Sequence, residues 1–138
     1  LSRGFQLRTV KKEYRARVAG LIAQDHGSID LPIMADWLNR PRQKISVDGK
    51  PSLTRYRVLQ RDTVDNSTLV ALEPVTGRSH QLRIHLREIG HPIIGCDLYA
   101  PPEVLARSPR LLLHACFLGL HHPATGLWQE FHCPTPFQ

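Results

Sequence analysis

One stretch of the chain reads Thr76-Gly77-Arg78-Ser79-His80-Gln81-Leu82-Arg83-Ile84-His85, the densest group of polar side chains in the sequence. Leu82, Leu86 and Ile89 are spaced four and three residues apart, which is the repeat of one face of an α-helix. Gly90 then supplies a stop signal. The pattern predicts a short helix that opens after the Thr-Gly-Arg turn and buries its apolar side.

The other side of this predicted helix is basic. His80, Arg83 and Arg87 are three and four residues apart, so they form one stripe away from the leucines. The free N–H groups at a helix start favour anions, which makes a phosphate or carboxylate partner plausible there. The same pattern is typical of an ordinary amphipathic helix with a solvated basic face. The spacing alone leaves both interpretations open.

The segment from Glu13 to Gly20 alternates at period two. It puts Tyr14 on the same side as Ala16 and Val18, and arginines on the other side, which predicts a strand with a basic outer face. At this spacing Tyr14 is by default an aromatic side chain that fills the inner face of a sheet.

Further strands are predicted on both sides of the helix, and turn-forming segments separate them as hairpins. An antiparallel sheet is therefore expected. The predicted strands are Leu53–Gln60, Leu69–Glu73, Leu111–Leu120 and Leu127–Phe131, and the turns are Asp62–Ser67 and His122–Gly126.

The region between Gly20 and the strand that begins at Leu53 is predicted to be a long ordered loop. It contains the turn-forming run Asp25–Ser28, and Pro32 and Pro41 rule out a regular helix or central strand across it. Polar and basic side chains gather near its tip, and such loops often carry function. The basic ones are Arg40, Arg42 and Lys44.

Composition bounds the class of protein. The chain has 138 residues, enough for one domain or a large piece of one, and a net charge of +6. Most of its basic residues are Arg, whose planar fork suits phosphates and stacks on bases, so a polyanionic partner such as RNA is favoured. No apolar run is long enough for a membrane span, and the first residues lack the pattern of a secretory signal.

Three cysteines without CxxC spacing argue against a disulfide framework and against a thiolate zinc site, and they indicate a reducing cytoplasm. His80 and His85 are five residues apart, on different helix faces, so no metal site is predicted. A hydrolase using Ser79 and Asp97 is disfavoured because no GxSxG elbow positions a nucleophile, and no P-loop motif occurs.

Three motifs resemble the RluA family of pseudouridine synthases, and they occur in the family's order. The first is Lys11–Val18, similar to the family's Lys-x-Tyr-x-Ala motif; the second is Gly77–His85 followed by Gly90–Tyr99; the third is Arg110–Ala115. The loop Asp30–Lys44 resembles the namesake subgroup, which modifies both large-subunit ribosomal RNA and a tRNA anticodon stem-loop.

The resemblance implies an α+β fold with a mixed, largely antiparallel sheet flanked by helices, and an active-site cleft across the sheet. It also implies that residues 1–138 are the carboxy-terminal portion of the catalytic domain. The family's His-Arg-Leu-Asp motif, which supplies the nucleophilic Asp, does not occur in the chain. The absent portion is expected to leave a sheet edge and apolar surface exposed.

Roles in isomerising uridine to pseudouridine are implied for several residues. Tyr14 is expected to pack on the target base and to take part in proton transfer, while Arg83 pairs with the nucleophilic Asp, and without that Asp it faces an open cleft as a fixed charge. Leu111 or Leu112 lines the base pocket. Contacts to the substrate are expected from His80 and from five cations, Arg40, Arg42, Lys44, Arg78 and Arg87.

The implied function is an RNA pseudouridine synthase of the cytoplasm, acting on ribosomal RNA, tRNA or both. The resemblance implies neither a metal nor an organic cofactor, and a monomer when the protein is complete. The chain alone is expected to be inactive. The alternative is a catalytically silent RNA-binding module that keeps the basic cleft.

Overall fold

Strands dominate the computed structural model, which describes residues 10–121 and 124–133. Two α-helices and one 3₁₀ turn accompany them. In chain order the elements are β1 (Val10–Ala19), β2 (His26–Asp30), β3 (Ile33–Ala35), η1 (Trp37–Asn39), β4 (Gln43–Ile45), β5 (Leu53–Asp62), β6 (Ser67–Pro74), α2 (Gln81–Glu88), α3 (Pro102–Leu105), β7 (Leu113–His121) and β8 (Trp128–His132).

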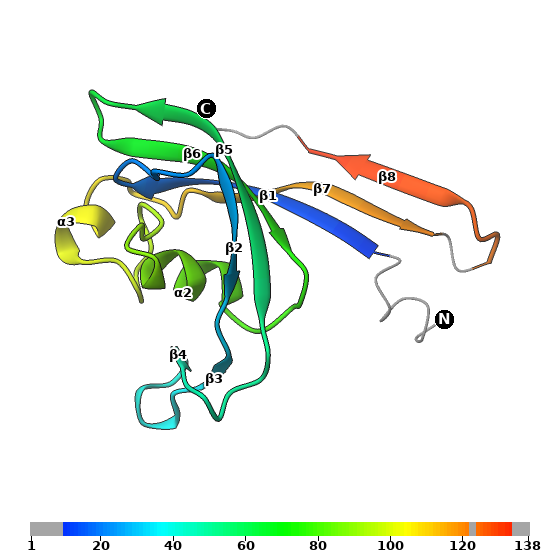
Figure 1. Ribbon diagram of the computed structural model, residues 1–138, viewed down its shortest axis with the longest axis horizontal. Helices are drawn as coiled ribbons and strands as arrows, with labels where there is room; N and C mark the ends of the chain where they lie inside the picture. The colour runs from blue at the N-terminus through cyan, green and yellow to red at the C-terminus, as the bar shows by residue number, and fades with distance from the viewer. Residues whose placement is uncertain (1–9, 122–123, 134–138) are drawn as a thin grey trace.

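Six strands form one sheet in the order β2-β5-β6-β1-β7-β8, and each neighbouring pair is antiparallel. The short strands β3 and β4 pair separately in a hairpin. Figure 1 shows α2 lying across one face of the large sheet, with α3 beside it and the β3–β4 hairpin extending below. The predicted α+β fold with a largely antiparallel sheet is confirmed.

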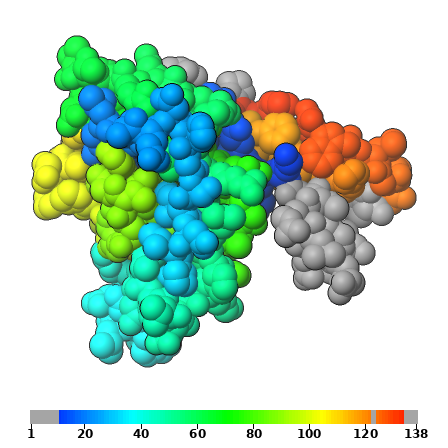
Figure 2. Space-filling view, in the orientation of Figure 1, coloured from blue at the N-terminus to red at the C-terminus, as the bar shows by residue number. Residues whose placement is uncertain are grey.

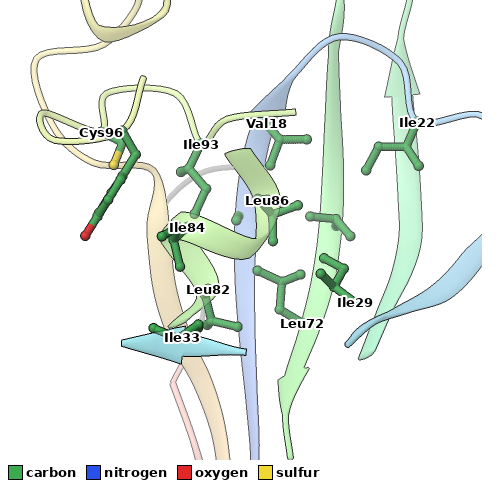
Figure 3. Packing of buried hydrophobic residues seen from close by; sticks show 13 residues of the cluster. Val18, Ile22, Ile29, Ile33, Leu72, Leu82, Ile84, Leu86, Ile93 and Cys96 are labelled. Carbon is green, nitrogen blue, oxygen red and sulfur yellow. The ribbon is translucent and has the colours of Figure 1, made fainter. Parts of the chain in front are cut away.

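The core lies between α2 and the central strands. Leu82, Ile84 and Leu86 of the helix pack against Val18 of β1 and Leu72 of β6, and all five side chains are buried. Figure 3 shows the helix side chains directed toward these strands. The apolar side of the predicted helix is therefore what fastens α2 to the sheet, and the opposite side is left for other contacts.

Strand β1 alternates as predicted, with Ala16 and Val18 fully buried on the helix side. Its other face is less solvated than expected. The guanidinium group of Arg17 is buried, and its Nη1 donates to Ser67 Oγ at 3.0 Å, while Arg15 pairs with Glu13 at 3.4 Å. The prediction of a basic outer face is wrong for Arg17, because a neighbouring strand supplies a buried acceptor for it.

The loop prediction between β1 and β5 needs two corrections. The predicted turn at Asp25–Ser28 is largely strand β2, which pairs with β5, because tertiary pairing overrides local turn preference. A Cβ atom at Gly27 would lie 2.7 Å from the Tyr56 hydroxyl, so the small residue allows this pairing. The basic loop holds the β3–β4 hairpin, with Pro32 before β3 and Pro41 at the tip.

The hairpin of β7 and β8 extends away from the rest of the sheet (Figure 1). All five residues of β8 are exposed, and β8 is one edge of the sheet. The exposed apolar surface that was predicted is present here: Leu118, Leu127, Trp128 and Phe131 are between 37% and 67% exposed. His122 and Pro123 of the predicted turn lie outside the described residues.

Candidate active site

Tyr14 reaches the helix-covered side of the sheet from β1. It stands opposite Leu72 of β6 and Ala115 of β7, beside a register shift between Glu13 and Tyr14. Its ring is half-buried and packs against the edge of the core. The phenol therefore combines an apolar wall with partial access from solvent, which is what a side chain that stacks on a base needs.

The strand register distinguishes the leucines of the third motif. Leu113 is paired with Ala16, two residues from Tyr14 on the same face of β1, and Leu111 precedes it at period two. Both pack against the core, whereas Leu112 is not among the residues that do so. Of Leu111 and Leu112, the inward-facing leucine is thus Leu111, and Leu113, which the sequence did not single out, is closer to Tyr14 along the strand.

His80 lies outside the helix in which it was predicted. It is the N-cap of α2, with φ of 56° in the left-handed region, and the first helical residue is Gln81. The prediction of a helical stripe from His80 through Arg83 is therefore wrong in its first member. The Gln81 side chain explains why the helix begins no earlier than Gln81. Its Oε1 accepts hydrogen bonds from the Arg78 N–H at 3.0 Å and from Thr76 Oγ1 at 2.7 Å, and these bonds hold the preceding residues in a turn.

Arg83 has partners that its sequence position did not suggest. Its Nη2 lies 2.7 Å from Asp97 Oδ1, and its Nε donates to Cys96 Sγ at 3.3 Å. The Arg83 side chain is 18% exposed and that of Asp97 is 74% exposed. The expectation that Arg83 is unpaired in this chain is wrong, because the loop after α2 brings a carboxylate to it.

Tyr99 joins the helix start to the β3–β4 hairpin. Its hydroxyl oxygen accepts the Gln43 N–H at 2.8 Å and lies 2.7 Å from His80 Nδ1. Burial raises the pKa of Tyr99. Burial, followed by the charge of Arg83, lowers the pKa of His80, so both shifts favour the neutral forms of the two hydrogen-bonded side chains.

Three guanidinium groups surround the Tyr99 ring. Those of Arg42, Arg83 and Arg87 lie 5.0, 5.6 and 5.4 Å from the ring centre. Arg42 also donates to the Leu98 carbonyl. We call these three arginines, His80 and Tyr99 the Tyr99 cluster; its positive charge suits a phosphate group. The sequence did not single out Tyr99 as a site residue. Its place at the end of the second family motif, Gly90–Tyr99, was the one indication of a functional position.

The other predicted cations lie outside this cluster. Arg78 donates to the Pro51 carbonyl at 2.8 and 3.1 Å, and Arg40 lies over the Trp37 ring at the hairpin tip. Lys44 is exposed on β4, opposite Met34. The structure thus brings together four of the predicted substrate-binding and catalytic residues in the Tyr99 cluster, namely His80, Arg42, Arg83 and Arg87. Arg40, Lys44 and Arg78 lie outside that cluster.

A groove of about 510 Å³ runs between the β3–β4 hairpin and the turn before α2. Lys50 and Arg78 give its wall positive charge, and Asp48 adds one carboxylate. Ser79 and Gln43 also line it, so the groove adjoins the Tyr99 cluster through sequence neighbours of His80 and Arg42. Among the described residues, no three His, Cys, Asp or Glu side chains are grouped as metal ligands would be.

A family model supplies the decisive comparison, because the model of RNA pseudouridylate synthase matches residues 1–88. The chain belongs to the RNA pseudouridylate synthase family. Among solved structures, the human RNA pseudouridylate synthase domain containing 1 shares this fold with a TM-score of 0.85 at 32% identity, and the likeness covers 99% of this chain and 59% of the human chain.

Curated members of the pseudouridylate synthase family extend the likeness over 99% of this chain. The dual-specificity RNA pseudouridine synthase RluA of Pasteurella multocida is 51% identical to it, and that of Escherichia coli strain K12 is 49% identical. The chain spans 63% of the length of each of these relatives. The resemblance to the RluA group seen in the three motifs is confirmed.

Proposed function

We propose that the protein of which this chain is a part isomerises uridine to pseudouridine in large-subunit ribosomal RNA, a tRNA stem-loop, or both. The observation that carries the proposal is the identity of about half of all residues with the two RluA relatives, whose names state a dual-specificity RNA pseudouridine synthase. The likeness covers 99% of this chain.

The reaction breaks the bond between the ribose and a uracil nitrogen, rotates the base and joins it again through carbon. The site must therefore hold the uracil throughout and exclude water. Tyr14 provides a half-buried aromatic surface for the base, and its hydroxyl is the group we assign to the proton transfer at the uracil carbon after the base is rejoined. The target nucleotide leaves the RNA stack to reach it.

Arg83 orients the nucleophilic carboxylate in this proposal. A guanidinium has five N–H donors, and Asp97 and Cys96 occupy two of those of Arg83. The remaining donors suffice for a further carboxylate supplied by the rest of the protein. Asp97 and Cys96 then hold the guanidinium in place before that carboxylate arrives, and the paired Asp stays ionised despite partial burial.

RNA backbone contacts are assigned by place in the structure. Arg42 and Arg87 lie around the same Tyr99 ring as Arg83 and are assigned to phosphates next to the target nucleotide, although Arg87 also pairs with Glu88. Arg40, Lys44 and Arg78 on the hairpin and groove rim are assigned to more distant phosphates. Leu111, with Leu113 two residues further on, is assigned to the apolar wall of the base pocket.

The setting we propose is the cytoplasm, with the complete protein a monomer that needs neither metal nor organic cofactor. The three free cysteines support a reducing compartment. No helix in residues 10–121 and 124–133 is long and apolar enough to cross a membrane.

The test compares this chain alone with a chimera in which it is joined to the unmatched part of the Pasteurella multocida relative. Pseudouridine is measured in a transcribed anticodon stem-loop and in a ribosomal RNA hairpin. We expect product only with the chimera. If neither protein forms product while both bind the RNA, the catalytically silent RNA-binding module becomes the better function.

A further inference from the structure

The tip of the β3–β4 hairpin carries two neighbouring apolar side chains in solvent. Trp37 is 69% exposed and Leu38 is 92% exposed. Single exposed apolar residues are common, but a large aromatic ring and a leucine side by side on a projecting tip are a pattern of binding surfaces. Figure 2 shows the hairpin segment as a lobe that stands out below the body of the molecule.

The tip is held in one conformation by its own hydrogen bonds. The Asn39 side-chain amide donates to both carboxylate oxygens of Asp36, at 3.2 and 3.1 Å, and the Asn39 N–H donates to the Asp36 carbonyl at 3.0 Å. The Asp36 N–H in turn reaches the Arg42 carbonyl at 2.9 Å. A surface that is already ordered loses little conformational entropy when it binds.

Arg40 completes the surface. Its guanidinium carbon lies 4.1 Å from the centre of the Trp37 ring, and its Nη1 donates to the Trp37 carbonyl at 2.8 Å. The indole is therefore fixed in orientation by a cation on one side while most of its area stays in water. Flat aromatic rings beside arginine are surfaces on which proteins stack unpaired bases.

The charge around the tip favours RNA over an apolar protein surface. Arg40, Arg42 and Lys44 lie on this hairpin, and the one carboxylate at the tip, Asp36, is occupied by Asn39. Arg42 and Gln43, at the tip end of β4, contact the Leu98 carbonyl and the Tyr99 hydroxyl. A partner bound at the tip is thus continuous with the basic Tyr99 cluster.

We propose that Trp37 and Arg40 form a stacking platform for an unpaired nucleobase of the RNA, one that flanks the target uridine. The platform rests on the proposed function for its partner, and it adds a contact to a second base, outside the pocket assigned to the target base. Stacking accepts any base, so it contributes affinity and register more than sequence selectivity.

The experiment titrates this chain with a transcribed RNA hairpin that has a uridine-containing unpaired loop. Trp37→Ala is expected to weaken binding by about 5- to 150-fold, the loss typical of one base–aromatic stack. Trp37→Phe, which keeps a ring, is expected to retain most of the affinity. Val64, an exposed apolar residue in the turn between β5 and β6, provides the control, since Val64→Ala is expected to change affinity less than about twofold.

Two further readouts separate stacking from charge. The salt dependence of binding is expected to stay the same in Trp37→Ala, because no phosphate contact is lost, and to weaken in Lys44→Ala. In a Trp128→Phe background the remaining indole is that of Trp37, and its fluorescence is expected to be quenched when the hairpin is added.

Unchanged affinity in Trp37→Ala, or fluorescence that does not respond to RNA, would overturn the platform while leaving the proposed function intact. Failure of the unaltered chain to bind the hairpin would overturn the RNA partner and the platform together. Loss of self-association in Trp37→Ala, measured by sedimentation with RNA affinity unchanged, would assign the tip to a contact between copies of the chain.

Discussion

His85 joins α2 to two other segments through a buried hydrogen-bond network. Its Nε2 donates to the Leu31 carbonyl at 2.9 Å, and its Nδ1 accepts from Thr54 Oγ1 at 2.8 Å. Gln81 Nε2 donates to the same hydroxyl at 2.9 Å. Since a carbonyl only accepts, the neutral ring satisfies every partner. Burial lowers the pKa of His85, and the bond to Leu31 only partly opposes this.

The stability of the chain is predicted to depend on the protonation of His85. Below the unfolded-state pKa of about 6.5 the unfolded chain binds this proton and the folded chain does not. The contribution is therefore complete above that pH and is lost as the pH falls through the lower, folded-state pKa. In His85→Gln, the free energy of unfolding from urea titrations is expected to vary less between about pH 7 and pH 5.

A second substitution separates titration from lost hydrogen bonding. Thr54→Val removes one partner of His85 but keeps the buried ring, so it is expected to cost about 1 to 3 kcal/mol at neutral pH while the pH dependence remains. Equal pH dependence in His85→Gln and in the unaltered chain would assign the titration to other groups.

At the residue scale, the sequence predicted the face on which a side chain lies better than it predicted the partners of that side chain. Tyr14 and Arg83 were selected by resemblance, and the period-two pattern placed Tyr14 on the correct face of β1. The pairing of Arg83 with Asp97 and the contacts of Tyr99 were not predicted. They depend on how the loop after α2 folds back, which no local pattern encodes.

Gly95 allows the segment after α2 to pass close to the residues that lead into β7, which begins at Leu113. Its φ of 80° is in the left-handed region, and an added Cβ atom would collide with the Arg110 carbonyl. The preceding residue, Ile94, makes two backbone hydrogen bonds of 3.0 Å. Its carbonyl accepts the Leu112 N–H, and its own N–H donates to the Arg17 carbonyl of β1. Gly95 therefore permits the connection that aligns the third motif with β1.

Gly95→Ala is predicted to destabilise the fold by more than about 2 kcal/mol, because backbone strain and a backbone collision add. Gly90 provides the matched control. Its φ is 89°, but nothing lies within 4 Å of an added Cβ, so Gly90→Ala is expected to cost only about 1 to 2 kcal/mol. Equal losses in thermal or urea unfolding would show that the close approach to Arg110 is not important.

At the element scale, strong periodicity predicted well and short or irregular elements did not. Strands β1, β5, β6, β7 and β8 and helix α2 were predicted within a few residues of their ends. Strand β2 was missed because its residues favour turns, and it exists through pairing with β5. The four-residue helix α3 is too short to give a periodic signal.

At the scale of the whole molecule, the basic Tyr99 cluster and the exposed apolar hairpin of β7 and β8 are separate features of the fold. Leu127, Trp128 and Phe131 on the β8 side of the sheet are exposed, and the chain spans 63% of the length of its RluA relatives. The function we propose therefore belongs to the complete protein, in which a nucleophilic carboxylate meets Arg83. That the nucleophilic carboxylate comes from outside this chain is a prediction from the family resemblance alone, because composition and periodicity carry no information on an absent motif.

The most direct test of this account is tritium release from an RNA hairpin labelled at uridine carbon 5, measured with the chimera and with the chimera carrying Arg83→Ala. We predict that Arg83→Ala lowers turnover by about 100-fold or more. Hairpin affinity should stay close to that of the unaltered chimera, because the partner left behind, Asp97, is 74% exposed and remains solvated. Normal turnover in Arg83→Ala would contradict the site assignment.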